Sequence, residues 1–195
     1  MAQGGGAQPP AAGPQQQDGF VFPIFYSYPP YYTLQPVKET QQKQRLLWRD
    51  LILRYCRHHR IHVVPAGETD DFPLFHNAGI NRRLSREMKV LFLDDLVKAG
   101  SALWFDKSQR SALVLWRSIA EWADAIYTWA RANGLEDSVV TVDEMQTGVY
   151  VAGTELEGLH REVLVRAVRH LEQQGRAKLF KGAAGDDEGI KFFPG

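Results

Sequence analysis

The sequence predicts a mainly α chain with small β-hairpins (an α+β fold), in which two tandem winged-helix domains follow an extended aromatic and proline-rich segment. Three observations predict it: the composition of residues 20–36, two long amphipathic helical patterns, and segments that recur about 75 positions apart. The expected divisions are a disordered Gly/Gln-rich tail, the extended segment, a first domain and a second domain, at residues 1–19, 20–36, 37–117 and 118–195.

Residues 20–36 have the most unusual composition in the chain. Seven aromatic residues fall within positions 20–32, and Pro23, Pro29, Pro30 and Pro36 lie among them. Proline fixes φ and removes a backbone donor, so the segment should run extended or as polyproline II, with rings on several sides. A small domain rarely buries so many rings from one segment, and leaving them in water would create a large apolar patch. We therefore expect the segment to dock on other chains.

Two other interpretations of this segment stay open. It could be an intramolecular strap that staples the N-terminus to its own domain. Its PPxY sequence (Pro29, Pro30, Tyr32) could also be a ligand for a WW domain, whose aromatic groove binds polyproline II helices.

The rest of the composition indicates a cytoplasmic protein. The tail at residues 1–19 is rich in Gly, Gln, Pro and Ala and has neither the basic start nor the apolar stretch of a signal peptide. The single cysteine, Cys56, excludes an intramolecular disulfide and suits a reducing compartment. No apolar run approaches the roughly 20 residues of a membrane span.

The first repeat unit begins with a long amphipathic helix at about 37–60, whose apolar positions have helical spacing: Leu46, Leu47, Leu51, Ile52 and Tyr55. We expect a loop around Pro65 and Gly67, then a short helix at about 73–84. A third helix should begin after the cap residue Ser85 and end at Gly100. Two strands, at about 102–105 and 112–116, complete the unit.

The second unit has the same plan. A helix is expected from Ser118 to about residue 132, then a strand at 139–142, a short helix beginning at 143–146, and a helix at 159–174. Two strands flank the loop 182–189. Trp48 and Ile52 of the first unit align with Trp122 and Ile126 of the second. Three helices and a terminal hairpin constitute a winged helix, a variant of the helix-turn-helix.

A DNA-binding transcriptional regulator is the alternative function, because a winged helix often enters the major groove. Net charge is zero, although residues 37–117 carry 15 Lys and Arg against 9 Asp and Glu, and residues 118–195 carry 8 against 13. The third helix of the second domain has three arginines, but its wing carries three carboxylates: Asp186, Asp187 and Glu188. Those carboxylates would repel phosphates, so we expect no nucleic-acid binding.

No cofactor, metal or catalytic site is expected. The cluster His58–His62 lacks a partner cysteine, and adjacent histidines on a helix point to different faces, which predicts a solvated helix end. Cys56 is expected to be a small packed residue. There is no Gly-rich phosphate loop or nucleophile elbow, so an enzyme is not indicated.

The order of several short motifs resembles the small winged-helix subunit of the ESCRT-II endosomal sorting complex, over about residues 22–193. The matching segments are Pro29–Pro36 (PPYYTLQP), Leu74–Asn77 (LFHN), Leu115–Arg117 (LWR), Ile126–Trp129 (IYTW) and Ile190–Phe193 (IKFF). An earlier motif of the family falls on Pro23–Tyr26, where Ile24 replaces a proline. The Gly/Gln-rich residues 1–18 also depart from the family pattern.

The resemblance implies a non-catalytic adaptor that sorts ubiquitinated cargo into multivesicular bodies. Two copies would each dock on one of two larger winged-helix subunits through the aromatic and proline-rich segment, by way of Pro23, Phe25, Tyr26, Tyr28, Pro29, Pro30 and Tyr32. The second domain would bind the N-terminal helix of an ESCRT-III subunit, and membrane association would be indirect, through recruitment to endosomes. Because that domain is acidic, we expect its contact residues to be Asp143, Glu144, Glu155 and Glu157.

Overall fold

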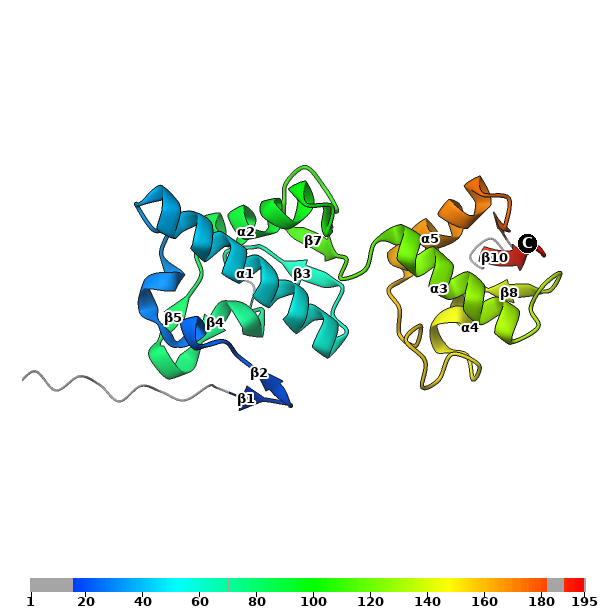
Figure 1. The fold of residues 1–195 in the computed structure, drawn as a ribbon, viewed down its shortest axis with the longest axis horizontal. Helices are drawn as coiled ribbons and strands as arrows, with labels where there is room; N and C mark the ends of the chain where they lie inside the picture. Colours follow the sequence, from blue (N-terminus) through cyan, green and yellow to red (C-terminus); the bar gives the residue numbers. More distant parts are fainter. Residues whose placement is uncertain (1–15, 70, 182–187, 195) are drawn as a thin grey trace, which may run out of the picture.

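The computed structural model describes residues 16–69, 71–181 and 188–194. Figure 1 shows an elongated molecule with one lobe for each half of the chain, joined by a short connection after β7. Each lobe mixes helices with a small antiparallel sheet, as the sequence predicts. The buried apolar side chains form two clusters, one from residues 20–114 and one from residues 113–192.

The N-terminal segment differs from the prediction in two ways. Strands β1 (Gln16–Gln17) and β2 (Phe20–Val21) pair in a small hairpin, so the last residues of the expected tail are ordered, while residues 1–15 lie outside the described part. The following residues form two 3₁₀ turns, Ile24–Ser27 and Pro29–Tyr32, where extended backbone was expected. Proline suits the first positions of such a turn, where no backbone donor is needed.

The first lobe is built on two helices and a three-stranded sheet. Its elements are α1 (Lys38–His59), β3 (Val63–Pro65), α2 (Arg86–Lys98), β6 (Ala102–Trp104) and β7 (Ser111–Val114). The strand order is β3-β7-β6. Helix α1 ends where Arg60 adopts a left-handed φ of 54°, and the Ser85 hydroxyl accepts a hydrogen bond from the Met88 amide to cap α2.

The prediction of a short helix at 73–84 is wrong. That stretch holds two 3₁₀ turns, at Pro73–Phe75 and Ala78–Ile80, separated by β4 (His76–Asn77), which pairs with β5 (Arg82–Arg83). Asn81 has a φ of 51°, a left-handed conformation that ends a helical run. Strand β3 was also missed, because Pro65 and Gly67 suggested a loop.

The second lobe has the predicted element order. It comprises α3 (Ile119–Ala132), β8 (Val139–Thr141), α4 (Val142–Thr147), α5 (Arg161–Gln173), β9 (Ala177–Lys181) and β10 (Glu188–Phe192), with strand order β8-β10-β9. Ser118 and Glu121 form a reciprocal capping box at the start of α3. Loop 182–187, including the acidic pair expected in the wing, lies outside the described residues.

Candidate protein-docking site

We use "strap" for residues 20–36, because this segment packs on its own lobe. Five of its rings are buried: Phe20, Phe22, Phe25, Tyr26 and Tyr32. Three of them pack around Trp48 of α1, whose ring centroid lies 5.4 Å from that of Tyr32, 5.6 Å from that of Phe25 and 6.2 Å from that of Tyr26. Phe20 and Phe22 pack instead against Tyr55, about two turns further along α1. Aromatic pairs at such distances stabilise a core beyond their buried area. The inner face of the strap therefore packs against its own lobe, as in the intramolecular interpretation.

Hydrogen bonds fix the buried tyrosines. The Tyr32 hydroxyl donates to the carbonyl of Tyr26 at 3.0 Å, and the Asn77 amide donates to the same carbonyl at 2.9 Å. Burial raises the pKa of Tyr26 to about 12 and also raises that of Tyr32, so both hydroxyls are neutral donors. The tyrosine of the PPxY sequence is thus a core residue and cannot insert into a WW groove while the strap is packed.

The residues expected to dock on partners divide between the two faces of the strap. Phe25, Tyr26 and Tyr32 point into the core, and Pro23 is half-buried. The argument that one small domain would not bury so many rings is wrong, because Trp48 and its neighbours provide enough apolar surface to cover five of them. The exposed members are Tyr28, Pro29 and Pro30.

We use "outer face" for the exposed apolar side chains of the strap and the start of α1. Its members are Ile24, Tyr28, Leu34, Val37, Leu46 and Leu47, between 37% and 61% exposed. The sequence placed Leu46 and Leu47 on the buried side of α1, but the apolar positions of this helix cover more of its circumference than one lobe can bury. This excess of apolar positions was the available signal for an outer face. Large apolar side chains left exposed on a small domain suit contact with another protein.

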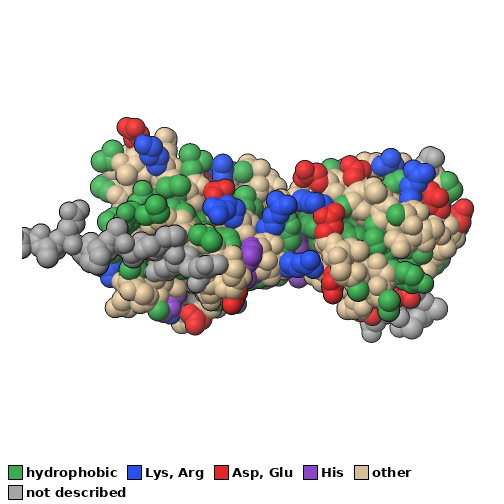
Figure 2. All heavy atoms as spheres, turned by 60° about the horizontal axis from the view of Figure 1, so that its bottom comes forward, with side chains coloured by type: hydrophobic (Ala, Val, Ile, Leu, Met, Phe, Trp, Pro, Cys, Tyr) green, Lys and Arg blue, Asp and Glu red, His purple; other side chains and the backbone are tan. Residues whose placement is uncertain are grey.

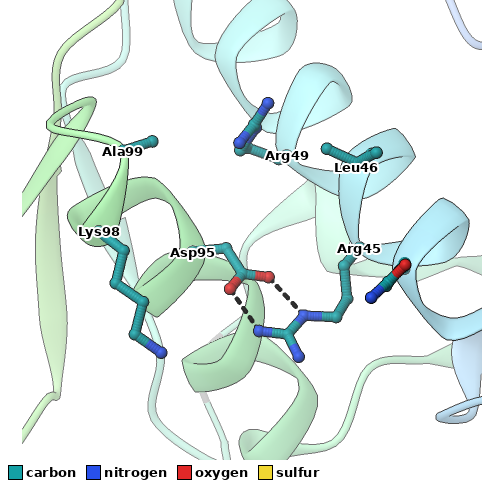
Figure 3. A pocket seen from close by; sticks show the side chains of 7 residues that line it. Arg45, Leu46, Arg49, Asp95, Lys98 and Ala99 are labelled. Carbon is teal, nitrogen blue, oxygen red and sulfur yellow. Dashed lines mark hydrogen bonds and ion pairs between the residues drawn. The ribbon is translucent and has the colours of Figure 1, made fainter. Parts of the chain in front are cut away.

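A hollow beside the outer face contains a structural ion pair. Figure 3 shows Arg45 of α1 facing Asp95 of α2, and the guanidinium donates two hydrogen bonds to the carboxylate, from Nε at 2.7 Å and from Nη2 at 2.5 Å. The carboxylate raises the pKa of Arg45. Because the pair joins the two helices in a bidentate geometry, it fixes α1 against α2.

The second lobe has an apolar groove of about 410 Å³ between α3, β8 and the end of α4. Its lining residues are Trp129, Leu135, Val139, Val140, Glu144, Gly148, Val149 and Tyr150. Val149 is 89% exposed and Tyr150 is 72% exposed. The Trp129 indole donates to the Tyr150 carbonyl at 3.2 Å, which holds this wall in place. The sequence analysis singled out Trp129 only as part of the motif at Ile126–Trp129 and did not predict the groove.

The four acidic residues expected to contact a partner are not brought together. Glu155 pairs with Arg117 at 2.6 Å, and Glu157 lies 3.9 Å from Arg60. Both carboxylates therefore face the first lobe at the junction, where Figure 2 shows basic and acidic side chains gathered between the lobes.

Asp143 and Glu144 lie on α4, beside the groove. The Glu144 carboxylate accepts hydrogen bonds from the amide and the hydroxyl of Thr141, at 2.8 and 3.0 Å, and completes a capping box. These bonds lower the pKa of Glu144. Both residues are exposed, and Asp143 is the freer of the two because the Glu144 carboxylate is engaged in the capping box.

Two of the three arginines of α5 are paired with carboxylates. Arg161 bonds Glu188 of β10, and Arg166 bonds Glu162 at 2.7 Å on the same helix. Such pairing reduces the positive charge that a DNA-reading helix would present.

The histidine cluster and the cysteine have ordinary structural surroundings. His62 is buried, contrary to the expected solvated helix end, while His58 is exposed. Burial raises the pKa of Cys56 and keeps its thiol protonated. Within residues 16–69, 71–181 and 188–194, no cluster of three His, Cys, Asp or Glu is placed to hold a metal ion. The helices in this same part of the chain include none that is long and apolar enough to cross a membrane.

Comparison with known proteins identifies the family. A family model described as "ESCRT-II complex subunit" matches residues 25–160. The chain is 48% identical over 178 residues to vacuolar protein sorting-associated protein 25 of Arabidopsis thaliana, a match that covers 91% of this chain and 98% of that protein. The human protein of the same name is 37% identical over 174 residues, covering 89% and 98%. The chain belongs to the ESCRT-II complex subunit family.

Solved structures of the ESCRT-II family have the same fold. The crystal structure of subunit VPS25 of the endosomal trafficking complex ESCRT-II matches with a TM-score of 0.77 and 28% identity, covering 87% of this chain and 97% of that one. A chain of the endosomal complex ESCRT-II (VPS22/VPS25/VPS36) matches with a TM-score of 0.76 and 27% identity, covering 87% and 98%. The alignment thus includes most of the strap and both lobes.

Proposed function

We propose that this chain is a non-catalytic adaptor subunit of an ESCRT-II complex and that each lobe is a winged-helix domain, at residues 37–117 and 118–195. The support is topological. Each lobe has a helix, a strand, helical turns or a short helix, a second long helix and a terminal hairpin, and the first strand pairs with the last. In the first lobe, the 3₁₀ turns around β4 take the place of the short helix.

The outer face carries the docking proposal. A solved relative assembles in a complex with VPS22 and VPS36, and we propose that two copies of this chain each dock on one of two such larger subunits. Tyr28, Pro29 and Pro30 form a rigid exposed turn, and Leu34 and Val37 continue the apolar surface toward α1. A proline-fixed turn loses little entropy on binding, and exposed aromatic rings are frequent hot spots.

Replacing Tyr28 and Leu34 together with alanine tests this docking. We expect affinity for the larger subunits to fall about 10- to 100-fold, because two apolar anchors are removed from the centre of the contact. Binding to the purified larger subunits is measured by surface plasmon resonance. Tyr150→Ala, the same truncation on the other lobe, should leave this affinity unchanged. Full-strength binding by the Tyr28/Leu34 variant would reject the outer face as the docking surface.

We further propose that the groove of the second lobe binds the N-terminal helix of an ESCRT-III subunit. Its apolar walls fit one face of an amphipathic helix, and the adjacent Asp143 and Glu144 favour basic residues on the flank of that helix. This replaces the expected contact through Glu155 and Glu157, whose carboxylates are paired with arginines at the junction.

Tyr150→Ala and Asp143→Lys test the groove. The first should weaken binding of the ESCRT-III helix about tenfold by removing apolar contact, and the second should weaken it less and make it less dependent on salt. Fluorescence anisotropy of the labelled helix at two salt concentrations measures both effects. The Tyr28/Leu34 variant is the matched control and should bind the helix normally. Unchanged affinity in both groove variants would eliminate this site.

The cellular role follows from these two contacts. We propose a cytoplasmic protein that is recruited peripherally to endosomal membranes through its complex and acts in sorting ubiquitinated cargo into multivesicular bodies. Regulation of transcription is the weaker alternative, because Arg161 and Arg166 are engaged by carboxylates.

A further inference from the structure

The strap needs an unusual source of hydrogen bonds. Its residues 33–37 belong to no helix or strand, and Pro29, Pro30 and Pro36 provide no backbone donors. A buried backbone carbonyl without a donor costs free energy comparable to a lost hydrogen bond. The positions of these groups therefore depend on side chains, from the body of the lobe and from Gln35 of the strap itself.

Gln44 of α1 makes three of these bonds, more than any other side chain, while the Gln35 side chain of the strap itself donates to the carbonyls of Pro30 at 2.6 Å and Thr33 at 3.3 Å. Gln44 is fully buried, although glutamine is mostly found at protein surfaces. Its amide nitrogen donates to the carbonyls of Tyr31 at 2.9 Å and Thr33 at 2.8 Å, and its amide oxygen accepts from the backbone of Gln35 at 3.2 Å. All three contacts of this carboxamide are to the backbone of the strap.

The geometry resembles one step of a β-ladder. In an extended chain, residues separated by two direct their backbone groups toward the same edge. The carbonyl of Thr33 and the amide of Gln35 satisfy that relation and meet one carboxamide, which replaces the backbone of a neighbouring strand. Leu34, the residue between them, is 42% exposed and belongs to the outer face.

Two neighbours support the same arrangement. The Trp48 indole, one turn further along α1, donates to the carbonyl of Tyr31 at 2.9 Å. The half-buried Gln41 donates from its side chain to the carbonyl of Gln35 at 3.1 Å. One side of α1 thus makes five hydrogen bonds to four backbone groups of residues 31, 33 and 35.

We infer that Gln44 is a positioning residue for docking: its carboxamide pre-organises residues 31–35 so that Tyr28 and Leu34 present a preformed surface to the larger subunits. This inference rests on the docking proposed above. A pre-organised surface loses less conformational entropy on binding, so the role of Gln44 should appear as affinity even though the side chain itself is buried away from any partner.

Gln44→Leu tests the inference, with Gln42→Leu as the matched control, because Gln42 is exposed on the same helix. We expect Gln44→Leu to weaken docking about tenfold and to accelerate amide hydrogen exchange at Gln35, since the variant keeps the side-chain volume and loses all three bonds. Gln42→Leu should change neither quantity. If Gln44→Leu does not fold, Gln41→Leu should give a smaller change of the same kind.

The outcomes separate the two proposals. Faster exchange at Gln35 together with weaker docking, at a melting temperature close to that of the unmodified chain, supports a positioning role. Normal docking by Gln44→Leu, with docking still weakened by Tyr28/Leu34→Ala, overturns the role of Gln44 and leaves the outer face intact. A lower melting temperature of Gln44→Leu with unchanged docking also overturns it, because the side chain would then contribute only to stability.

Discussion

At the scale of single residues, the buried polar side chains do more than the exposed ones to select one arrangement of the chain. Gln44, Asn77 and His62 are each at most 5% exposed, and each bonds the backbone of a segment distant in sequence. A buried polar group is stabilising only when it is hydrogen-bonded, so each of these residues favours one arrangement of the chain over its alternatives. His62 is the one of the three that can change its charge near neutral pH.

The first prediction at this scale concerns the pH dependence of stability. His62 stacks on Trp116, with ring centroids 3.9 Å apart, and its Nδ1–H donates to the carbonyl of Val114 at 3.2 Å. Burial lowers its pKa to about 4, the Val114 carbonyl opposes this shift, and nearby His160 adds to it. The folded state thus prefers the neutral ring. Its contribution is complete above the unfolded pKa of about 6.5 and is lost as pH falls from about 6.5 to about 4.

Urea unfolding at pH 7, 6 and 5 measures this effect. We expect the free energy of unfolding to decrease with falling pH, by about 2 kcal/mol between pH 7 and pH 5 from His62 alone. His62→Gln cannot titrate, so its stability should vary less over this range, and the difference between the two curves isolates the histidine from other groups. Parallel curves would mean that His62 is protonated in the folded state at an ordinary pKa.

At the scale of elements, the sequence predicts well what local patterns determine. The main helices were placed within about two residues of their ends, because apolar spacing and caps such as Ser85 and Ser118 are local signals. The strap was predicted poorly for the opposite reason. Its conformation depends on Trp48 and on Asn77, which bonds a carbonyl 51 positions away, and no pattern within residues 20–36 reveals either contact.

The candidate site shows the same division. Tyr28, Pro29 and Pro30, which the sequence assigned to docking on larger subunits, are exposed, and composition alone marks them as unusual. The assignment of Glu155 and Glu157 to a partner rested on net charge, which carries no information about which carboxylates already face an arginine. Net charge describes a whole lobe, whereas binding depends on the few groups that are left unpaired.

At the scale of the whole molecule, the junction determines how the outer face and the groove are oriented. Trp116 packs against both apolar clusters, and the lobes are joined by only a few residues after β7. Arg117 pairs with Glu155 at 2.6 Å and lies over the ring of Trp122 at 5.2 Å, while Arg60 reaches Glu157. These contacts hold the two candidate binding surfaces in one relative orientation, so two partners would be bound at a defined angle.

Removing the Arg117 side chain should loosen that angle without unfolding either lobe. We expect Arg117→Ala to reduce stability by less than about 1 kcal/mol, as for a partly exposed ion pair, and to broaden the distance distribution between spin labels at Gln42→Cys and Lys178→Cys. Both labelling positions are exposed, and the native Cys56 is buried.

Arg82→Ala, which removes an exposed arginine far from the junction, should leave the distribution narrow. Salt at 1 M should broaden the distribution of the unmodified chain in the same direction, because ion pairs at the junction are screened. An equally narrow distribution in Arg117→Ala would mean that the remaining junction contacts, the stacking of His62 on Trp116 and the Arg60–Glu157 pair, are enough to fix the angle.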